Sequence, residues 1–444
     1  MRLPFLLAFI LLVFSFSILA QGELKAAVDP PKSKDDIVLL PGLANLKPNK
    51  ALQIAEELYR VGDKAGAYHY YLAYHAKRRG NKYAQYRLAE TALFVRNYLG
   101  AHNFANGLLK KEKKFPKVHY YNGIALKSLG EYDKAVTEMN KYMIKYNLTG
   151  EDSILIAQQI EGAVVAAAHR PARNIKVKEL NKDINTIHSE NGGAMAAQGL
   201  LFTHVGEAGS IIRLAMNPET GRSKVVSLSG TVNRAGYQNS DPFLSEDGKT
   251  LFFTRCKSSN TGEVDCSIYA GTLQEKGKVT NVHKLGKGIN QPGYLAMQPI
   301  ITKNEFGREI LYFVSNRPGG FGGFDIWYSM RLNDGSFTRA YNVGRKINSD
   351  FNETTPYYEN QGSTLFFSSD HPTGFGGFDV YRIQGLQRYW EKAYNMGMPV
   401  NSSTDDYYFR KTDEKTGYLS SNRAGTKYAI HENDSDDMFI VKFE

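Results

Sequence analysis

The chain has 444 residues, 42% of them hydrophobic and 12% aromatic, and a formal net charge of +10. A chain of this size can bury two sizeable cores, which indicates two domains. Its only two cysteines form no Cys-x-x-Cys motif, and this argues against a redox pair or a metal site.

The N-terminus has the composition of a signal peptide. Arg2 supplies a positive charge, Leu3–Ile18 is almost wholly apolar, and Ala20 is a small residue of the kind that precedes a cleavage site. We therefore expect residues 1–20 to direct export to the periplasm, with a retained membrane anchor as the alternative. No cysteine lies near the cleavage site, so a lipid attachment point is not expected. Residues 21–50 contain several prolines and are expected to form an extended leader.

Residues 51–170 carry a repeat of small side chains with a period of 34 residues. Two helices per repeat, packed closely where small residues face one another, are typical of a tetratricopeptide (TPR) α-solenoid. The alternative is an ordinary helical bundle. The repeating positions are Ala55, Ala67, Ala89, Ala101, Gly123 and Ala135. Residues 152–169 are expected to form one further helix that caps the stack.

The helical region also offers candidate binding surfaces. Basic runs at 77–79 and 110–114 could face an acidic protein surface, membrane phosphates or water alone. Four tyrosines lie so close together in the first repeat that they cannot all face the core. We expect some of them to line a concave groove and to anchor a peptide. They are Tyr68, Tyr70, Tyr71 and Tyr74.

Residues 171–444 contain five copies of a pattern in which an apolar residue is followed, after three residues, by Ile or Val and then Asn. Spacings of roughly 50–60 residues predict a five-bladed β-propeller with one four-stranded sheet per blade. The asparagines are Asn185, Asn233, Asn290, Asn348 and Asn401. Only enough residues for three strands follow the last copy. A strand within 174–184 is therefore expected to complete the last blade and to close the ring. The predicted fold class is α+β multidomain, with the helices preceding the propeller.

The strands and turns of the blades repeat as well. Asp241-Pro242, Gln298-Pro299 and Thr355-Pro356 are each expected to begin an inner strand. Phe-Gly-Gly-Phe-Asp occurs at 321–325 and again at 375–379. We expect its glycines to adopt backbone angles that other residues avoid, and its aspartate to accept hydrogen bonds from the turn. The five asparagines should likewise bond turn backbone. A cation or ligand site is the alternative for the three corresponding aspartates, Asp325, Asp379 and Asp437.

The two cysteines, Cys256 and Cys266, are ten residues apart in one expected hairpin. Aligning the strands of this blade with those of the next places Cys256 opposite Asn316, and Cys266 at the position of Asp325. If these positions are cross-strand neighbours, a structural disulfide fits, and an exported protein meets an oxidising compartment.

The residues Leu311–Arg317 followed by Gly322–Trp327 resemble the WD40-like propeller repeats of TolB-type and OmpA-associated proteins of the Bacteroidota. TPR repeats ahead of such a propeller resemble the N-terminal part of PorE-like components of the type IX secretion system. The resemblance implies a noncatalytic scaffold of the cell envelope, held near the outer membrane by protein partners. It implies no catalytic residue, cofactor, metal or nucleic acid. Because those proteins continue into an OmpA-type domain and this chain does not, direct peptidoglycan binding is not expected.

The alternative function is a propeller that binds or cleaves a glycan. Five-bladed propellers also house glycoside hydrolases, which need isolated carboxylates projecting into a central pocket. Asp241 is the best candidate, with Glu190 and Glu353 near comparable blade entrances. A serine peptidase is less favoured than a glycosidase, because the sequence has no G-x-S-x-G motif and no α/β-hydrolase segment follows the propeller. The acidic run 432–437 lacks a full calcium-loop pattern, and His431-Glu432 lacks the second histidine of a metalloprotease helix.

Overall fold

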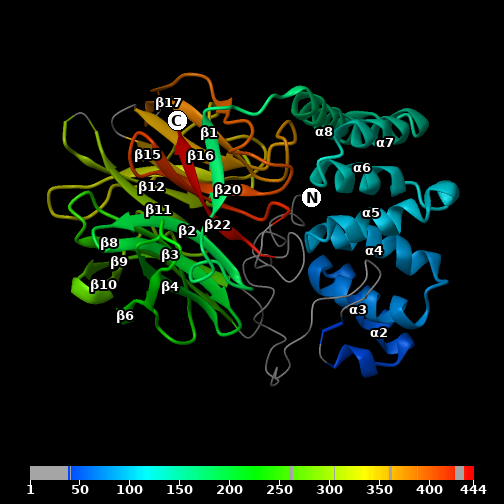
Figure 1. Ribbon diagram of the computed structural model, residues 1–444, viewed down its shortest axis with the longest axis horizontal. Helices are drawn as coiled ribbons and strands as arrows, with labels where there is room; N and C mark the ends of the chain where they lie inside the picture. Colours follow the sequence, from blue (N-terminus) through cyan, green and yellow to red (C-terminus); the bar gives the residue numbers. More distant parts are fainter. Residues whose placement is uncertain are drawn as a thin grey trace. The chain divides into compact units, whose positions relative to one another are not determined.

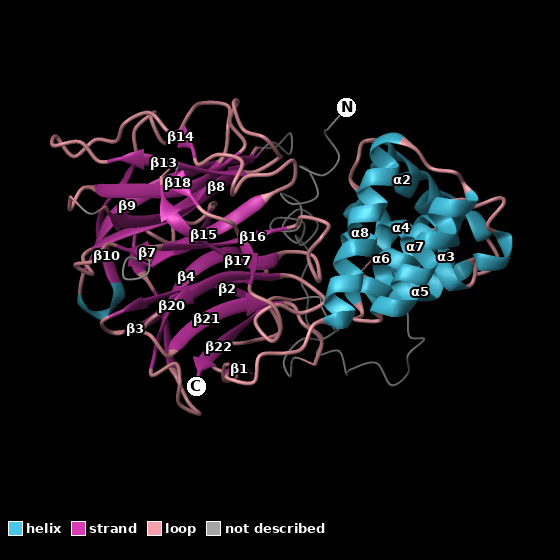
Figure 2. Ribbon diagram, turned by 90° about the horizontal axis from the view of Figure 1, so that it is seen from above, coloured by secondary structure: helices cyan, strands magenta, loops and turns pink. Residues whose placement is uncertain are grey.

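A computed structural model describes residues 39–444, except for 41, 260–263, 305, 360–362, 388 and 426–434. The described residues form two compact units, one up to Ala168 and one from His169 onward (Figure 1). Within them, the α-helices belong to the first unit and the β-strands to the second (Figure 2). The expected signal peptide, most of the expected leader and His431-Glu432 lie outside the described residues. No described helix has the length and apolar character needed to cross a membrane.

The first unit is a succession of helices joined by short turns. Asp63, Asn81 and Asn97 begin three of these helices, since each side chain accepts hydrogen bonds from backbone N–H groups of the first turn. The helices are α2 (Pro48–Arg60), α3 (Lys64–Lys77), α4 (Lys82–Phe94), α5 (Tyr98–Asn106), α6 (Val118–Ser128), α7 (Tyr132–Lys145) and α8 (Gly150–Ala168).

The small residues that repeat every 34 positions lie where these helices meet. Each of the five alanines is fully buried. A Cβ atom added to Gly123 of α6 would collide with the Met139 side chain of α7. The helix axes can therefore approach one another closely at these positions, as the sequence pattern predicts.

The tyrosines expected to line a groove are mostly in the core instead. Tyr68, Tyr71 and Tyr74 of α3 are 6%, 0% and 8% exposed, and Tyr70 is partly buried. Their hydroxyl groups reach polar partners at the edge of the core, as in the bond from Tyr71 to Glu56 of α2 at 2.8 Å. Tyrosine can thus be buried without losing its hydrogen bond. Tyr68, Tyr71 and Tyr74 are therefore not free to anchor a peptide.

The second unit is a five-bladed β-propeller. Four of its blades follow one another along the chain, and their strands pair antiparallel except for the short β6, which pairs parallel with β10. The first two comprise β2 (Ser189–Ala196), β3 (Gly199–Gly206), β4 (Gly209–Met216) and β5 (Lys224–Ser227), and then β6 (Ser229–Gly230), β7 (Gln238–Leu244), β8 (Thr250–Ser258), β9 (Val264–Leu273) and β10 (Lys278–Lys284). The next two comprise β11 (Ala296–Lys303), β12 (Glu309–Ser315), β13 (Asp325–Met330) and β14 (Tyr341–Asn342), and then β15 (Glu353–Glu359), β16 (Thr364–Ser369), β17 (Asp379–Leu386), β18 (Tyr389–Trp390) and β19 (Tyr394–Asn395).

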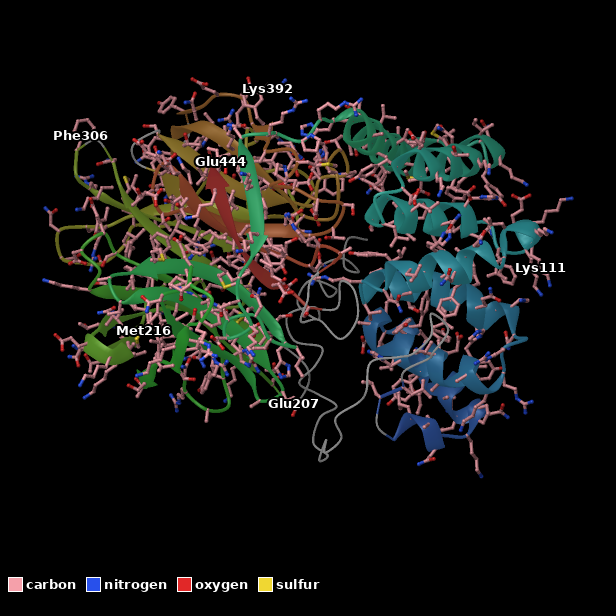
Figure 3. The ribbon with its side chains drawn as sticks, viewed as in Figure 1. Lys111, Glu207, Met216, Phe306, Lys392 and Glu444 are labelled. Carbon is pink, nitrogen blue, oxygen red and sulfur yellow. A yellow bond between two sulfur atoms is a disulfide. The ribbon has the colours of Figure 1, made fainter. Side chains whose placement is uncertain are left out.

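The fifth blade joins the two ends of the propeller sequence. It comprises β20 (Asp406–Lys411), β21 (Thr416–Ser421), β22 (Asp437–Phe443) and, as its outer strand, β1 (Ile175–Glu179). β1 pairs antiparallel with β22, from Ile175 opposite Phe443 to Glu179 opposite Phe439. Glu444, labelled in Figure 3, also donates its backbone N–H to the Asn174 carbonyl at 2.8 Å. The predicted closing strand is therefore present, although it is shorter than residues 174–184.

Apolar side chains fill the space between neighbouring blades. One cluster joins Phe202 of β3 with Tyr418 and Met438 of the last blade, across the junction where the ring closes. Another joins Phe366 of β16 with Phe409 of β20, and Ile175 and Val177 of β1 pack against that cluster. Side chains on the inner faces of the sheets thus hold each blade to the next.

We predict that β1 stabilises the whole propeller. Val177→Asp would place a carboxylate against this apolar cluster and should lower the free energy of unfolding by about 2 kcal/mol or more. Lys178→Asp is the matched control, because Lys178 is exposed on the same strand, and its effect should stay below about 1 kcal/mol. Trp327 and Trp390, the only tryptophans, both lie in the propeller and report denaturant unfolding by fluorescence. Equal losses for the two variants would contradict a closing role for β1.

Candidate functional site

Each inner strand carries the same irregularity where it passes the centre of the ring. Register breaks interrupt the pairing of β2, β7, β11, β15 and β20 with the following strands. One residue of each break has a positive φ: 70°, 55°, 54°, 49° and 54° for Gly192, Asp241, Gln298, Thr355 and Tyr408. Such bulges redirect a side chain out of the normal alternation of a strand. The dipeptides that end in Pro242, Pro299 and Pro356 therefore lie inside the inner strands rather than at their starts.

The redirected side chains meet in one hydrogen-bonded network. The Tyr408 hydroxyl donates to Asp241 Oδ1 at 2.5 Å and accepts from Gln298 Nε2 at 3.1 Å. Gln298 Oε1 accepts from the Thr355 backbone N–H at 2.8 Å. All four residues are at most 6% exposed, and burial beside the Asp241 carboxylate raises the pKa of Tyr408 well above its ordinary value. Because these residues come from four inner strands, the network joins four of the five blades near the centre of the ring.

Arg410 lies on the same strand as Tyr408 and carries a buried positive charge. Its Nη1 donates to the carbonyl oxygens of Gly193 and Pro242, at 3.1 and 2.9 Å. Its guanidinium also lies 5.2 Å from the centre of the Phe243 ring. Burial lowers the pKa of Arg410 to about 10. These contacts join β20 to the inner strands of the first two blades.

A pocket of about 350 Å³ opens where the inner strands end. Phe243, Tyr357 and Tyr358 contribute aromatic rings, and residues of the strand ends and following turns contribute charged groups. Because these residues come from four blades, the pocket is a feature of the closed ring. The full lining is Phe243, Leu244, Glu246, Ile301, Thr302, Lys303, Glu309, Tyr357, Tyr358, Glu359, Lys411, Thr412 and Asp413.

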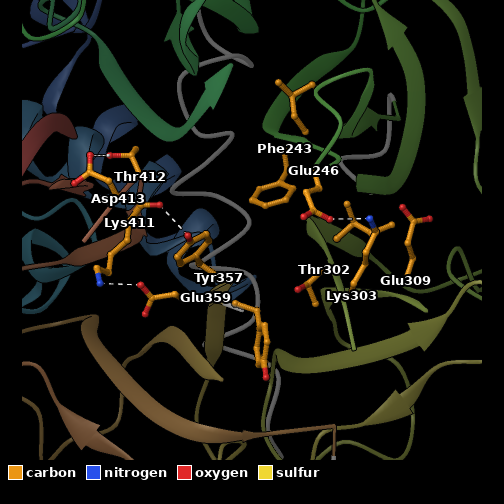
Figure 4. A pocket seen from close by; sticks show the side chains of 13 residues that line it. Phe243, Glu246, Thr302, Lys303, Glu309, Tyr357, Glu359, Lys411, Thr412 and Asp413 are labelled. Carbon is orange, nitrogen blue, oxygen red and sulfur yellow. Dashed lines mark hydrogen bonds and ion pairs between the residues drawn. The ribbon is translucent and has the colours of Figure 1, made fainter. Parts of the chain in front are cut away.

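Two ion pairs face each other across this pocket (Figure 4). Lys411 Nζ lies 2.7 Å from Glu359 Oε1 on one side, and Lys303 Nζ lies 2.8 Å from Glu246 Oε2 on the other. On the first side, the Tyr357 hydroxyl also donates to the Lys411 carbonyl at 2.8 Å. Partly exposed polar groups beside aromatic rings can bind a ligand that has both apolar faces and hydroxyl groups.

The three carboxylates first considered for catalysis have structural partners. Asp241 belongs to the central network. Glu190 accepts hydrogen bonds from Thr186 and His204, and its Oε1 lies 2.6 Å from His204 Nδ1. Glu353 accepts from the backbone and hydroxyl of Ser349 and from the hydroxyl of Ser369. None of the three lines the pocket.

The five repeated asparagines bond strand backbone rather than only turns. Asn290 shows the arrangement: its side-chain amide accepts from the Ile268 N–H at 2.7 Å and donates to the Ile268 carbonyl at 2.9 Å. The amide group thus takes the place of a neighbouring strand at that residue. Asn185, Asn233, Asn348 and Asn401 make the same pair of bonds to Met438, Ile212, Ile326 and Val380.

The Phe-Gly-Gly-Phe-Asp turns are built as expected around their aspartates. Asp325 accepts from Phe321 N at 2.5 Å and Gly322 N at 3.2 Å, and Asp379 makes the corresponding bonds. The glycines are needed for a different reason than expected. Gly322 does not have a positive φ, but a Cβ atom at this position would collide with the carbonyl group of Phe351. Asp437 is buried at the start of β22 and pairs in register with Ser421. No group of metal-binding side chains occurs among the described residues.

Cys256 and Cys266 are register partners on β8 and β9, and their sulfur atoms are bonded at 2.01 Å. The expected alignment of Cys266 with Asp325 is wrong by one residue. Asn290 and Asn348 bond Ile268 and Ile326, so Cys266 corresponds to Phe324. The disulfide therefore joins a cross-strand pair at the end of one hairpin.

The propeller is similar in fold to solved structures of very different sequence. An aldose sugar dehydrogenase from Escherichia coli is 11% identical, with a TM-score of 0.38, over 61% of this chain and 100% of that chain. An α-L-arabinofuranosidase from Lactobacillus brevis is 10% identical, with a TM-score of 0.41, over 59% and 91%. A xylan β-1,4-xylosidase from Bacillus halodurans is 14% identical, with a TM-score of 0.41, over 61% and 54%. No protein-family model and no curated protein matches the sequence.

These similarities contradict the expectation of a noncatalytic scaffold and the expectation that the chain is not an enzyme. The proteins just named share the propeller architecture, and all three are enzymes. At such low identity the likeness shows the fold alone. The expectation had no support from the architecture, since a propeller is a frame that can carry many kinds of site. The chemistry has to be argued from the side chains of this chain.

Sequence reasoning did not find the pocket residues. They do not repeat from blade to blade, and each blade supplies only a few of them. One signal was present, because Phe243 and Tyr357 each follow by one residue a proline recognised in an inner strand. The sequence pattern did not reveal where the bulges interrupt the strand register. Without that register, Phe243 and Tyr357 could not be assigned to the pocket.

We predict that Glu353 makes the propeller less stable as pH rises. Burial raises the pKa of Glu353 to about 8, so the folded state binds its proton more tightly than the unfolded state does. Stability should fall between about pH 4.5 and 8, by about 1.4 kcal/mol for each unit of pKa difference. In Glu353→Gln this part of the fall should vanish in denaturant titrations at several pH values. Asp247→Asn is the control. A hydrogen bond from Ser245 lowers the pKa of Asp247, so this variant should keep the fall in stability between about pH 4.5 and 8. A parallel pH dependence in wild type and Glu353→Gln would contradict the prediction.

Proposed function

We propose that the propeller binds a carbohydrate in the pocket at the end of its central channel. The observation that supports this most is the combination of three aromatic side chains with four carboxylates in one cavity of about 350 Å³. Aromatic rings can cover the apolar faces of a sugar ring, and carboxylates accept hydrogen bonds from its hydroxyl groups. The volume is at the lower end of the range for ligand pockets, which favours one or two sugar units.

The arrangement of the walls supports the same proposal. Lys411 orients Glu359, since both side chains of this ion pair are partly buried, whereas the pair of Lys303 with Glu246 is exposed and orients Glu246 only weakly. Tyr357 is held by its bond to the Lys411 carbonyl and by packing against the Phe366 ring, with ring centres 6.1 Å apart. A pocket whose polar groups are already oriented loses less entropy on binding.

For the remaining parts of the chain, we propose a three-repeat TPR solenoid and export from the cytoplasm. The buried small residues at the 34-residue period support the solenoid, with α2–α3, α4–α5 and α6–α7 as its helix pairs. The charge and apolar pattern of residues 1–20 supports export, and the Cys256–Cys266 bond suits an oxidising compartment.

Calorimetry of the full chain with a panel of neutral oligosaccharides tests carbohydrate binding. Tyr357→Ala should weaken binding of the best ligand by roughly threefold to tenfold, because it removes a stacking surface. Tyr389→Ala is the matched control, since Tyr389 lies in the same blade, is 87% exposed and does not line the pocket. Chromatography of the same oligosaccharides after incubation with the chain would show whether the chain also cleaves them, because cleavage gives shorter products.

Thermal unfolding of both variants shows whether Tyr357→Ala is still folded. Should it unfold early, Glu359→Gln provides a second test, because it changes a pocket oxygen to an amide with almost no change in size. Absence of saccharide binding by the wild-type chain, or equal affinity for wild type and both pocket variants, would refute the proposed function.

A further inference from the structure

The pocket has a charge of the opposite sign to the chain as a whole. Its lining contains Glu246, Glu309, Glu359 and Asp413 against Lys303 and Lys411, so four negative and two positive groups give −2, and Arg331, which pairs with Glu309 from outside the lining, reduces this to −1. The complete chain carries +10. A local charge of this kind does not follow from overall composition. It attracts a cation to the pocket and disfavours an anionic ligand.

Asp413 is the carboxylate that is least neutralised. Glu246 and Glu359 are paired with the two lysines, and Glu309 is paired with Arg331 at 2.8 Å. Asp413 instead accepts the Lys415 backbone N–H at 2.7 Å and the Thr412 hydroxyl at 3.3 Å, and it forms no ion pair with a described side chain. The Lys415 amide also lowers the pKa of Asp413, which keeps its carboxylate ionised.

The wall that carries Asp413 combines carboxylates with an aromatic ring. Glu359 is paired with Lys411 Nζ at 2.7 Å, which leaves Asp413 as the carboxylate of this wall without an ion pair to a described side chain. Figure 4 places Asp413, Lys411, Glu359 and Tyr357 together on this side of the pocket. Carboxylates combined with aromatic faces are the surroundings in which proteins bind organic ammonium ions.

We infer that the ligand is an amino sugar with a free, protonated amine, and that Asp413 is the counter-ion of this amine. The aromatic rings of the pocket contact the sugar ring, while the excess negative charge selects the amine over a neutral or acidic substituent at the same position. This inference rests on the proposed carbohydrate binding and adds to it the chemical class of the sugar.

Calorimetry with three matched tetrasaccharides tests the inference on the full chain. They are a β-1,4-linked glucosamine oligomer, its fully N-acetylated form and an oligomer of a uronic acid. We expect the amine form to bind about tenfold more tightly than the acetylated form, and the uronic acid to bind most weakly. Added salt should weaken binding of the amine form more than that of the acetylated form.

Asp413→Asn should remove most of this preference, because it should weaken binding of the amine form much more than binding of the acetylated oligomer. Asp334→Asn is the matched control, because Asp334 also accepts a backbone N–H two residues later, from Ser336 at 2.9 Å, but does not line the pocket. Unchanged preference in Asp413→Asn would overturn the inference.

Two further outcomes separate this inference from the proposed function. Equal binding of the amine and acetylated forms, both weakened by Tyr357→Ala, would overturn the inference and leave carbohydrate binding intact. Failure of all three oligomers and of the neutral panel to bind would refute both.

Spermidine, a polyamine without a sugar ring, tests whether the sugar is recognised as well as the charge. It should bind at least tenfold more weakly than the glucosamine oligomer. Equal binding would overturn the inference, because the pocket would then recognise charge alone.

Discussion

Antiparallel pairing between β1 and β22 is the interaction on which the rest of the propeller depends. The last blade contains only three strands of its own, and β1 supplies the fourth from the other end of the propeller sequence. Without it, two edges with unpaired backbone groups would remain. Closure also brings the inner strands around one axis, so that Tyr408 reaches Asp241, 167 positions away in the sequence.

The bulges of the inner strands then decide where a ligand can bind. They turn Asp241, Gln298, Thr355 and Tyr408 toward the axis, where hydrogen bonds join them into one buried network. The pocket forms where these strands end, because the following residues of the same strands provide aromatic and charged side chains. The bulges thus set which side chains of an inner strand join the network and which reach the pocket.

The side chains that recur in every blade and those that do not recur have different roles in this propeller. The groups that recur in each blade, such as Asn290 and its four counterparts, satisfy backbone groups that have no strand partner. The pocket groups do not recur, and their charges differ from blade to blade, with Asp413 in one and Lys303 in another. A repeated fold can therefore keep its frame constant while a few unmatched side chains set the ligand chemistry.

Patterns in the amino-acid sequence were enough to predict the five blades, the closing strand, the close packing of the helices and the pairing of the two cysteines. These features follow from local periodicity and from small or turn-forming residues, which act over short distances. The three-dimensional arrangement was needed to see that Tyr68, Tyr71 and Tyr74 are buried, and that Glu190 and Glu353 bond residues of their own blades. It alone brought Phe243, Tyr357 and Asp413 into one pocket, because that neighbourhood depends on ring closure and on bulge register, which join residues distant in the chain.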